Sequence, residues 1–287
     1  MNSIVSSDSP IQALHVLSVD IGGSHIKATV ISSEGGIKEE YDKVDTPNPA
    51  DPENVIKAIK GLAKNYKSFD KVSVGFPGYV KDGIIFTAPN LGTNFWKNFN
   101  LRERLEKELL KPALVINDAD LQGLGLVDGI GFEMVITLGT GFGTAFLKDG
   151  ILLPHIELAH HPITKKHTYD KYVGEIALQT AGEEKWNLRM KKVIETLKIV
   201  FNYDKLYISG GNGSKLNFPL DANMRLVSNV DGIKGGLRLW LASPLKSASP
   251  IYIGKPEDIE KLKSSKKENK SIKNEVKSGK KEPKSKK

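Results

Sequence analysis

Two glycine-rich loops, each directly after an apolar run typical of a β-strand, constrain this chain more than any other feature. DIGGSHIK at 20–27 follows LHVLSV, and LGTGFGT at 138–144 follows EMVIT. Glycine has no Cβ to block a phosphate, and the freed backbone N–H groups form an anion-binding concavity. One such loop is often only a tight turn, but two can hold one phosphate chain from both sides. The pair favours a phosphotransferase.

Short β-branched runs alternate with longer helical patterns along the chain, and the same order occurs twice. The first series contains LHVLSVD, IKATVIS, ENVIKAIKGLAKNY, KVSVGF, NLRERLEKELL and ALVIND; the second contains EMVITLG, GTAFLKDGILL, a long helical stretch from about Tyr172 to Phe201, and KLYISGG. This alternation predicts an α/β fold with a partly parallel sheet. A chain of 287 residues suits two lobes. We expect related lobes at 1–117 and 118–254 around a central cleft.

The net charge of +8 is unevenly distributed. Residues 255–287 contain 13 lysines and 6 acidic residues, which accounts for +7 of the total, so the preceding part is nearly neutral. Because 255–287 is also poor in apolar residues, we expect a disordered Lys-rich tail. Such a tail could simply solubilise the chain, or attract nucleic acid nonspecifically through phosphate contacts.

Several classes of protein are excluded by what the sequence lacks. It has no run of 18 or more apolar residues, which excludes a membrane-spanning helix. The first residues, MNSIVSSDSPIQA, have no basic segment leading into an apolar one, so we expect no secretory signal and a cytoplasmic location. Zero cysteines exclude disulfides, thiolate metal sites and cysteine nucleophiles.

Between the two loops, INDADLQGLGL ends a predicted strand and begins a helix at Asp118 or Ala119. An aspartate at the carboxyl end of a strand in an open α/β sheet faces the crevice where ligands bind. Asp118 could therefore accept the proton of an attacking hydroxyl while Asn117 hydrogen-bonds the substrate. The alternative is that Asp118 caps the helix, and the two roles can coexist.

Seven motifs in sequence order resemble those of the ROK sugar kinases, within the actin-like ATPase and hexokinase superfamily. They are DIGGSHIKATV, GFPGYV, TAPN, INDAD, TLGTGFGTA, ELAHH and ISGGNGS, and the resemblance covers about residues 12–243. Within that family the chain is most similar to the polyphosphate glucokinase branch. The resemblance implies two actin-like (ribonuclease H-like) lobes that close over a sugar, with the phosphoryl donor in the cleft.

The resemblance also implies a role for each matched residue, with Asp118 as the catalytic base. The implied sugar-binding residues are Asn117, Asp118, Glu157, His160, Gly78 and Asn90. The implied donor-binding residues are Asp20, Gly22, Gly23, Ser24, Lys27, Gly139, Thr140, Gly141, Gly143, Gly210, Gly211 and Gly213. Mg²⁺ is the expected cofactor because the charge on donor oxygens must be neutralised, and Asp20 could hold it through water. Plain alternatives stay open: a type II turn for Gly78, a loop cap for Asn90 and a surface position for Lys27.

The chain departs from the family pattern in four respects. It lacks the cysteine cluster that binds structural zinc in many ROK proteins, so we predict no zinc site despite three histidines within 160–167. Ala159 stands where the family has glycine, and Asn212 interrupts a glycine triplet, which puts the fine substrate geometry in question. The family's second sugar-binding glutamate has no clear match; Glu175 is the candidate, with a solvated helix position as the alternative.

We therefore expect a hexose kinase that transfers a phosphoryl group from polyphosphate, ATP or both to the 6-hydroxyl of a sugar, with glucose favoured. The close rival is a kinase of another hexose or of an N-acetylhexosamine. A sugar-sensing regulator is disfavoured, because only about a dozen residues precede the first strand and no DNA-reading motif is present. A homodimer is an open expectation. The tail could concentrate polyphosphate near the cleft, and any contact with nucleic acid would be nonspecific.

Overall fold

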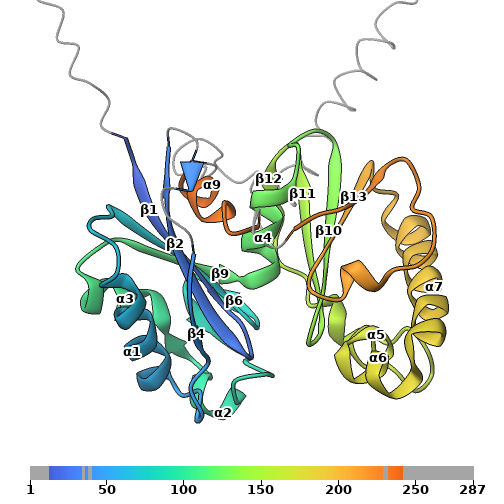
Figure 1. The fold of residues 1–287 in the computed structure, drawn as a ribbon, viewed down its shortest axis with the longest axis horizontal. Coiled ribbons are helices and arrows are strands. Elements are labelled where there is room, and N and C mark those ends of the chain that lie inside the picture. The colour runs from blue at the N-terminus through green and yellow to red at the C-terminus, as the bar shows by residue number, and fades with distance from the viewer. Residues whose placement is uncertain (1–12, 34–35, 38–40, 229–231, 242–287) are drawn as a thin grey trace, which may run out of the picture. The chain divides into compact units, whose positions relative to one another are not determined.

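A computed structural model describes residues 13–33, 36–37, 41–228 and 232–241 (Figure 1). These residues form two mixed sheets flanked by helices, so the predicted α/β fold is confirmed. The tail predicted at 255–287 lies outside the described residues. None of the helices in the described part is long and apolar enough to cross a bilayer.

The first sheet is built around a hairpin that encloses the first glycine loop. Its spatial order is β3 (Gly36–Ile37), β2 (His25–Ser32), β1 (His15–Ile21), β5 (Lys71–Phe76) and β9 (Ala113–Asn117), with β4 (Asp42–Asp45) also paired to β2. Strands β1 and β2 are antiparallel, while β5 and β9 continue the sheet parallel to β1. The carboxyl ends of β1, β5 and β9 therefore meet at one edge of this sheet.

The second sheet repeats this arrangement around the second glycine loop. Its order is β12 (Ile151–Leu152), β11 (Phe142–Lys148), β10 (Phe132–Leu138), β13 (Lys205–Ser209) and β14 (Met224–Leu226). Strands β10 and β11 are antiparallel, while β13 and β14 continue parallel to β10. The repeated order of strand, glycine loop and strand thus corresponds to a repeated sheet topology. The lobe boundary at residues 117 and 118 stays a prediction.

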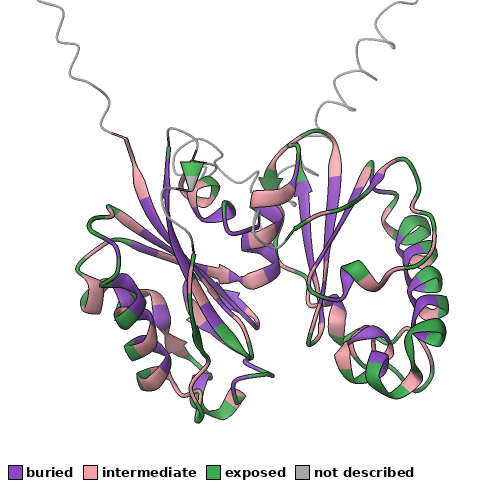
Figure 2. Ribbon diagram, viewed as in Figure 1, coloured by how far each residue is buried: buried purple, intermediate pink, exposed green. Residues whose placement is uncertain are grey.

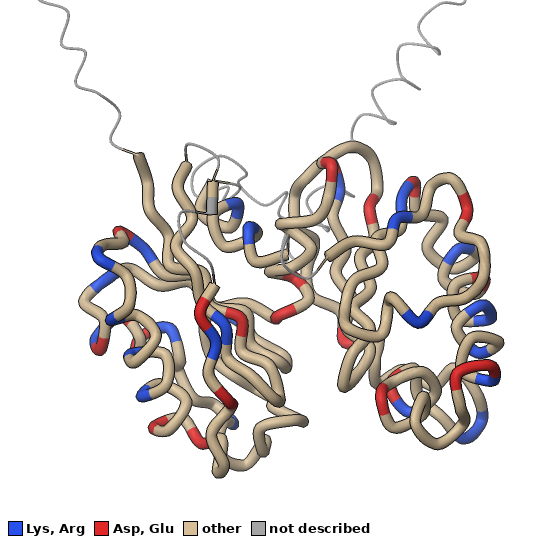
Figure 3. The backbone as a smooth tube through the Cα atoms, in the orientation of Figure 1, with Lys and Arg blue, Asp and Glu red and all other residues tan. Residues whose placement is uncertain are grey.

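Amphipathic helices cover the sheets. Those beside the first sheet are α1 (Pro52–Ala63) and α3 (Leu101–Leu109), and those beside the second are α5 (Tyr169–Val173), α6 (Glu175–Ala181) and α7 (Glu183–Phe201). In α1 the Asp51 carboxylate caps the N–H of Asn54 at 3.0 Å, and Val55, Ile56, Ile59 and Leu62 form the buried face. Many Lys and Arg positions lie along α1, α3 and α7 (Figure 3), while the strands between are largely buried (Figure 2).

The helical stretch expected from Tyr172 to Phe201 is divided into separate helices, which corrects that prediction. Gly174 has extended backbone angles and ends α5, and Gly182, with φ of 76°, ends α6 before α7 begins. A left-handed or extended glycine between two helices turns the chain and stops the hydrogen-bond ladder. The breaks allow the short helices to approach the second glycine loop.

Two helices lie between the sheets: α4 (Asp118–Leu126) and α9 (Gly235–Leu241) (Figure 1). Small residues allow this close packing, since a Cβ at Gly123 would lie 2.8 Å from that of Ala145 in β11. Two buried serines of the first sheet hold the α9 region: Ser18 Oγ donates to Ile233 O at 2.8 Å, and Ser73 Oγ donates to Gly236 O at 2.6 Å. The chain thus returns to the first sheet after completing the second.

The remaining elements are short. They are α2 (Thr93–Trp96), the small sheet of β6 (Val80–Lys81), β7 (Ile84–Ile85) and β8 (Phe99–Asn100), and the 3-10 turns η1 (Leu158–His160) and η2 (Gly213–Lys215).

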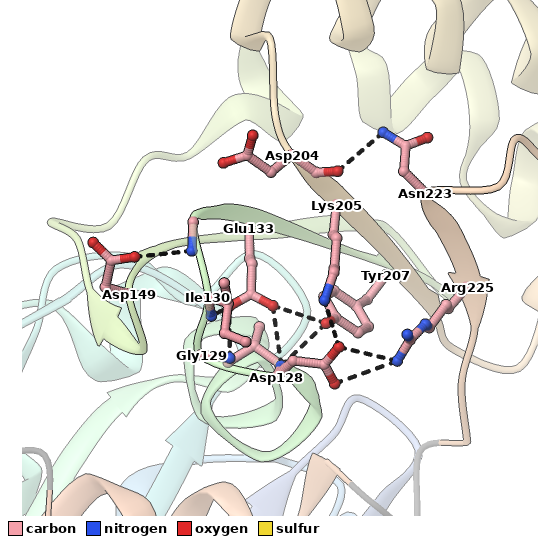
Figure 4. Close-up of polar contacts among 12 residues, drawn as sticks. Asp128, Gly129, Ile130, Glu133, Asp149, Asp204, Lys205, Tyr207, Asn223 and Arg225 are labelled. Carbon is pink, nitrogen blue, oxygen red and sulfur yellow. Dashed lines mark hydrogen bonds and ion pairs between the residues drawn. The ribbon is translucent and has the colours of Figure 1, made fainter.

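A buried glutamate fixes the loop between α4 and β10 (Figure 4). The side chain of Glu133 accepts hydrogen bonds from the backbone N–H groups of Asp128, Gly129 and Ile130, at 3.0, 2.8 and 3.1 Å, and from the Tyr207 hydroxyl at 2.8 Å. Glu133 itself is fully buried. Because four donors satisfy one carboxylate, its burial is compatible with a stable fold, and the loop is held at the start of β10.

Candidate active site

A pocket of about 230 Å³ lies where the carboxyl ends of parallel strands from both sheets meet. Its walls are formed by residues at the ends of strands. Gly22 and Gly23 come after β1, Asn117 and Asp118 lie at the end of β9, and Gly210 comes directly after β13. The full lining is Gly22, Gly23, Pro77, Gly78, Pro89, Asn90, Asn117, Asp118, Gln122, Thr137, Leu138, Gly139, Thr140, Gly141, Phe142, Gly143, Glu157, Ala159, His160, Asp170, Gly210 and Gly211. Open α/β sheets bind ligands at this edge.

The N-terminus of α4 is held by Asn117. Its Oδ1 accepts hydrogen bonds from the N–H groups of Ala119 at 2.8 Å and Asp120 at 3.3 Å, so Asn117 is the helix cap. Its Nδ2 donates to the carbonyl oxygen of Gly78 at 3.1 Å, which ties the helix to the turn after β5. A Cβ at Gly78 would overlap the backbone oxygen of Thr87, so the turn requires glycine. Asp118 is left to face the pocket from a fixed helix end.

The environment of Asp118 favours its protonated form to an unusual degree for an aspartate. Burial is the largest cause, the charge of Asp20 adds to it, and Glu157 and Asp120 contribute, raising the pKa of Asp118 to about 7. The N–H of Ala119, which donates to Oδ1 at 2.9 Å, acts in the opposite direction. A carboxylate that titrates near neutrality can take up a proton and release it again, which is what general base chemistry requires.

Asp20 lies at the carboxyl end of β1, directly across the ladder from Lys27 in β2. Burial raises the pKa of Asp20, and the charge of Lys27 opposes that rise. Lys27 and Ser24 are not part of the pocket lining, so the structure places Lys27 beside Asp20 rather than in the pocket. The described residues contain no cluster of three or more potential metal ligands.

Hydrogen bonds from α5, α6 and the segment after β13 hold the second glycine loop in place. Asp170 Oδ1 accepts a hydrogen bond from the N–H of Phe142 at 2.9 Å, and the N–H of Glu175 donates to Gly139 O at 3.1 Å. Asn212 donates from its backbone to Leu138 O at 2.9 Å and from Nδ2 to Glu175 Oε2 at 2.6 Å. Two family departures, Asn212 and Glu175, are therefore partners in one support for this loop.

This arrangement changes the interpretation of Glu175. It does not line the pocket, so the structure does not place it where a sugar-binding glutamate would lie. It is also not a freely solvated helix residue, because the hydrogen bonds from Asn212 and Gln179 lower the pKa of its carboxyl. Asn212 is buried, and its side chain also donates a hydrogen bond to the carbonyl oxygen of Gly139 in the loop at 3.3 Å, a contact that a glycine at this position could not make.

On the opposite side of the pocket, Glu157 and His160 stand at the two ends of the η1 turn. His160 Nε2 lies 4.0 Å from Glu157 Oε2, and the His160 side chain is 58% exposed. Glu157 Oε1 lies 3.4 Å from Nε2 of His155, a buried histidine behind the pocket wall. No periodicity or motif in the sequence singled out His155, because its second partner, Asp120, lies 35 positions earlier in the chain.

Known proteins resemble this chain in sequence and in fold. Residues 16–156 match the model of the ROK family. This chain contains a ROK family domain. The polyphosphate glucokinase of Mycobacterium tuberculosis is 29% identical over 212 residues, which cover 70% of this chain and 78% of the relative. The glucokinase of Halalkalibacterium halodurans is 32% identical over 151 residues, covering 47% of this chain and 44% of that enzyme.

A solved structure shows the same fold. The inorganic polyphosphate/ATP-glucomannokinase of Arthrobacter sp. strain KM superposes with a TM-score of 0.72 at 26% identity, over 79% of this chain and 99% of the other. The ROK resemblance found in the sequence motifs is confirmed by these matches.

The pocket brings together most of the residues that the sequence singled out. Four of them lie outside its lining: Asp20, Ser24, Lys27 and Gly213. Three polar lining residues were not anticipated: Gln122, Thr137 and Asp170. Among the described residues, neither Lys nor Arg lines the pocket, so the groups there that could donate to an anion are backbone N–H groups and uncharged or histidine side chains.

Proposed function

We propose that this chain is a hexose kinase that transfers a phosphoryl group from ATP, polyphosphate or both to the 6-hydroxyl of glucose. Its class, a phosphotransferase with a sugar hydroxyl as acceptor, follows from its glucokinase and polyphosphate glucokinase relatives. The observation that carries the proposal is Asp118, whose pKa is raised to about 7 in a pocket walled by two glycine loops.

In this mechanism Asp118 acts as the general base. As the 6-hydroxyl oxygen bonds to the terminal phosphorus of the donor, its proton passes to the Asp118 carboxylate. The bond between that phosphorus and the bridging oxygen of the donor breaks, and the bond's electron pair stays on the shortened donor. Proximity and charge stabilisation supply most of the rate in such transfers, so positioning by the two loops is central.

The two glycine loops are proposed to bind the donor phosphates from opposite sides. Gly22 and Gly23 approach from the first sheet, and Gly139 to Gly143 from the second. A Cβ at Gly143 would overlap the hydroxyl of Thr137 and meet Ala119 in the first turn of α4. Glycine at this position therefore lets the donor loop and the helix that bears the base approach closely.

The sugar is proposed to lie between the η1 turn and the turn after β5. Glu157 and His160 would contact hydroxyls from one side, and Asn90 and the backbone around Gly78 from the other. Asn117 already bonds Gly78 and the helix, so its main contribution is to set the distance between Asp118 and this sugar side.

A divalent cation fits this site. Burial and the charge of Asp20 together raise the pKa of Asp118, and neither Lys nor Arg lines the described pocket to balance the two carboxyl groups. Mg²⁺ is usually held by one or two carboxylates together with water and substrate phosphates, which agrees with the absence of a larger ligand cluster in the described residues. Asp20 would hold the ion through water, and the ion would neutralise charge on the donor phosphates.

Product formation by the purified full chain tests the proposal. Glucose, mannose, fructose and N-acetylmannosamine are each offered with Mg²⁺ and either ATP or polyphosphate, and the sugar phosphate is measured. We expect glucose 6-phosphate with at least one donor, and its loss in Asp118→Asn but not in Asp149→Asn, a change in an exposed turn. A product from another sugar alone would reassign the substrate. A folded protein without activity would refute a kinase. A homodimer and a cytoplasmic location stay predictions from the sequence.

A further inference from the structure

Behind the pocket wall, a buried histidine joins two carboxylates. The side chain of His155 is 8% exposed and does not line the pocket. Its Nε2 lies 3.4 Å from Glu157 Oε1, and its Nδ1 lies 2.9 Å from Asp120 Oδ2. Glu157 does line the pocket, with its other oxygen toward His160. The imidazole ring therefore stands between a pocket residue and a residue of α4.

The far side of His155 faces a buried carboxylate on α4. The Asp120 side chain is 5% exposed, and it lies in the first turn of α4, two residues after Asp118. Its backbone N–H is bound by the Asn117 cap at 3.3 Å. The His155 ring also stacks on Tyr79, with ring centres 6.4 Å apart and planes inclined by 21°. Tyr79 directly follows Gly78 of the sugar-side turn.

The charges at this position favour an imidazolium. Burial by itself would lower the pKa of His155, but the contacts with Asp120 and Glu157 raise it to about 10. Asp118, Asp120 and Glu157 lie near one another, since Glu157 and Asp120 both raise the pKa of Asp118. With neither Lys nor Arg in the described lining, His155 supplies a positive charge behind this group of acids.

We propose that His155 is a positioning residue that fixes the Glu157 carboxylate against the sugar by tying it to Asp120 on the helix of the catalytic base. This inference rests on the proposed sugar kinase function. The imidazole ring then sets the distance between Glu157, which orients the sugar, and Asp118, which accepts the proton of the sugar hydroxyl. Since a buried ion pair fixes geometry best when both partners are bonded, losing one side should loosen Glu157.

The test is a comparison of glucose binding and turnover in His155→Gln, Glu157→Gln and the double variant. We expect His155→Gln to raise both the calorimetric Kd and the KM for glucose by about tenfold, with the donor KM changed less than about twofold. In the Glu157→Gln background the same change should have little further effect, because both act through one contact. His167→Gln, in an exposed loop, is the matched control and should behave as wild type.

The outcomes separate the two proposals. If wild type binds no glucose, the proposed function fails and this inference fails with it. If wild type binds glucose but His155→Gln binds it equally well, or if the two changes are additive, only the positioning role is refuted. A purely structural role would reduce the active fraction without moving the KM. If His155→Gln does not fold, Asp120→Asn is used instead, because it removes the charge that pairs with His155 Nδ1. If the inference is right, this variant must also raise the KM for glucose.

Discussion

Replacing Asp118 by asparagine should stabilise the fold, and the gain should grow with pH. In the folded chain Asp118 binds its proton up to about pH 7, whereas its ordinary pKa is 3.8. Between these values the folded state holds more protons than the unfolded state. The contribution of this group to the free energy of unfolding therefore falls as pH rises through this window. Asparagine cannot ionise, so the variant escapes that loss.

The magnitude follows from the shift. Moving the pKa from 3.8 to about 7 is a change of about 3 units, and about 1.4 kcal/mol per unit gives an upper limit of about 4 kcal/mol. Asp118 is only partly buried, because it borders the open pocket, and water screens its charge. We therefore expect the stability advantage of Asp118→Asn over wild type, measured as the free energy of unfolding, to be about 2 kcal/mol larger above pH 7 than at pH 5.

Urea unfolding of wild type and Asp118→Asn at about pH 5 and about pH 8, with EDTA present, measures this gain. Asp128→Asn is a control whose effect should not depend on pH in this range. The hydrogen bond from Lys205 is the largest cause that lowers the pKa of Asp128 below its ordinary value of 3.8, so its contribution to the free energy of unfolding is lost only below that pH, and the variant should be less stable than wild type by the same amount at both pH values. Equal offsets of Asp118→Asn from wild type at the two pH values would refute the reasoning.

Three further predictions concern activity and stability. The kcat/KM for glucose should fall about tenfold per pH unit below about pH 7, because Asp118 must be deprotonated to act; a flat profile between about pH 5.5 and 8 would contradict this. Glu133→Ala should lower the free energy of unfolding by about 3–5 kcal/mol, since four donors lose one buried acceptor, and a loss below about 1 kcal/mol in chemical unfolding would be inconsistent with the structure. Asp170→Ala frees the Phe142 N–H and should raise the donor KM by about tenfold while glucose affinity measured by calorimetry stays constant; equal changes in both would count against a donor-loop role.

Features that depend on neighbouring residues could be predicted from the sequence. The glycine loops, the strand before each loop and the helix start after Asn117 are all encoded within a few positions, because strand periodicity, glycine and helix caps act locally. The structure places the second loop's glycines where the motif indicated, although Gly143 belongs to β11 rather than to the loop itself.

Features that depend on contacts between distant segments could not be predicted. The return of α9 to the first sheet relies on Ser18 and Ser73, which look like ordinary strand residues. The bond between Asn212 and Glu175 joins positions that appeared in the motifs only as departures. His155 has one partner two residues away and another 35 positions earlier. Local patterns carry no signal for such pairs, so the support of the site was missing from the sequence prediction.

The most direct test of Asp118 as the general base is the rate of glucose 6-phosphate formation by Asp118→Asn, measured beside its affinity for glucose. Removing a positioned base usually costs about 10²–10⁴-fold in rate. We predict a loss of that size in kcat, with the calorimetric Kd for glucose within about threefold of wild type because the Asn117 cap and Glu157 remain. A folded variant that binds glucose and retains more than about a tenth of the wild-type kcat would contradict the assignment.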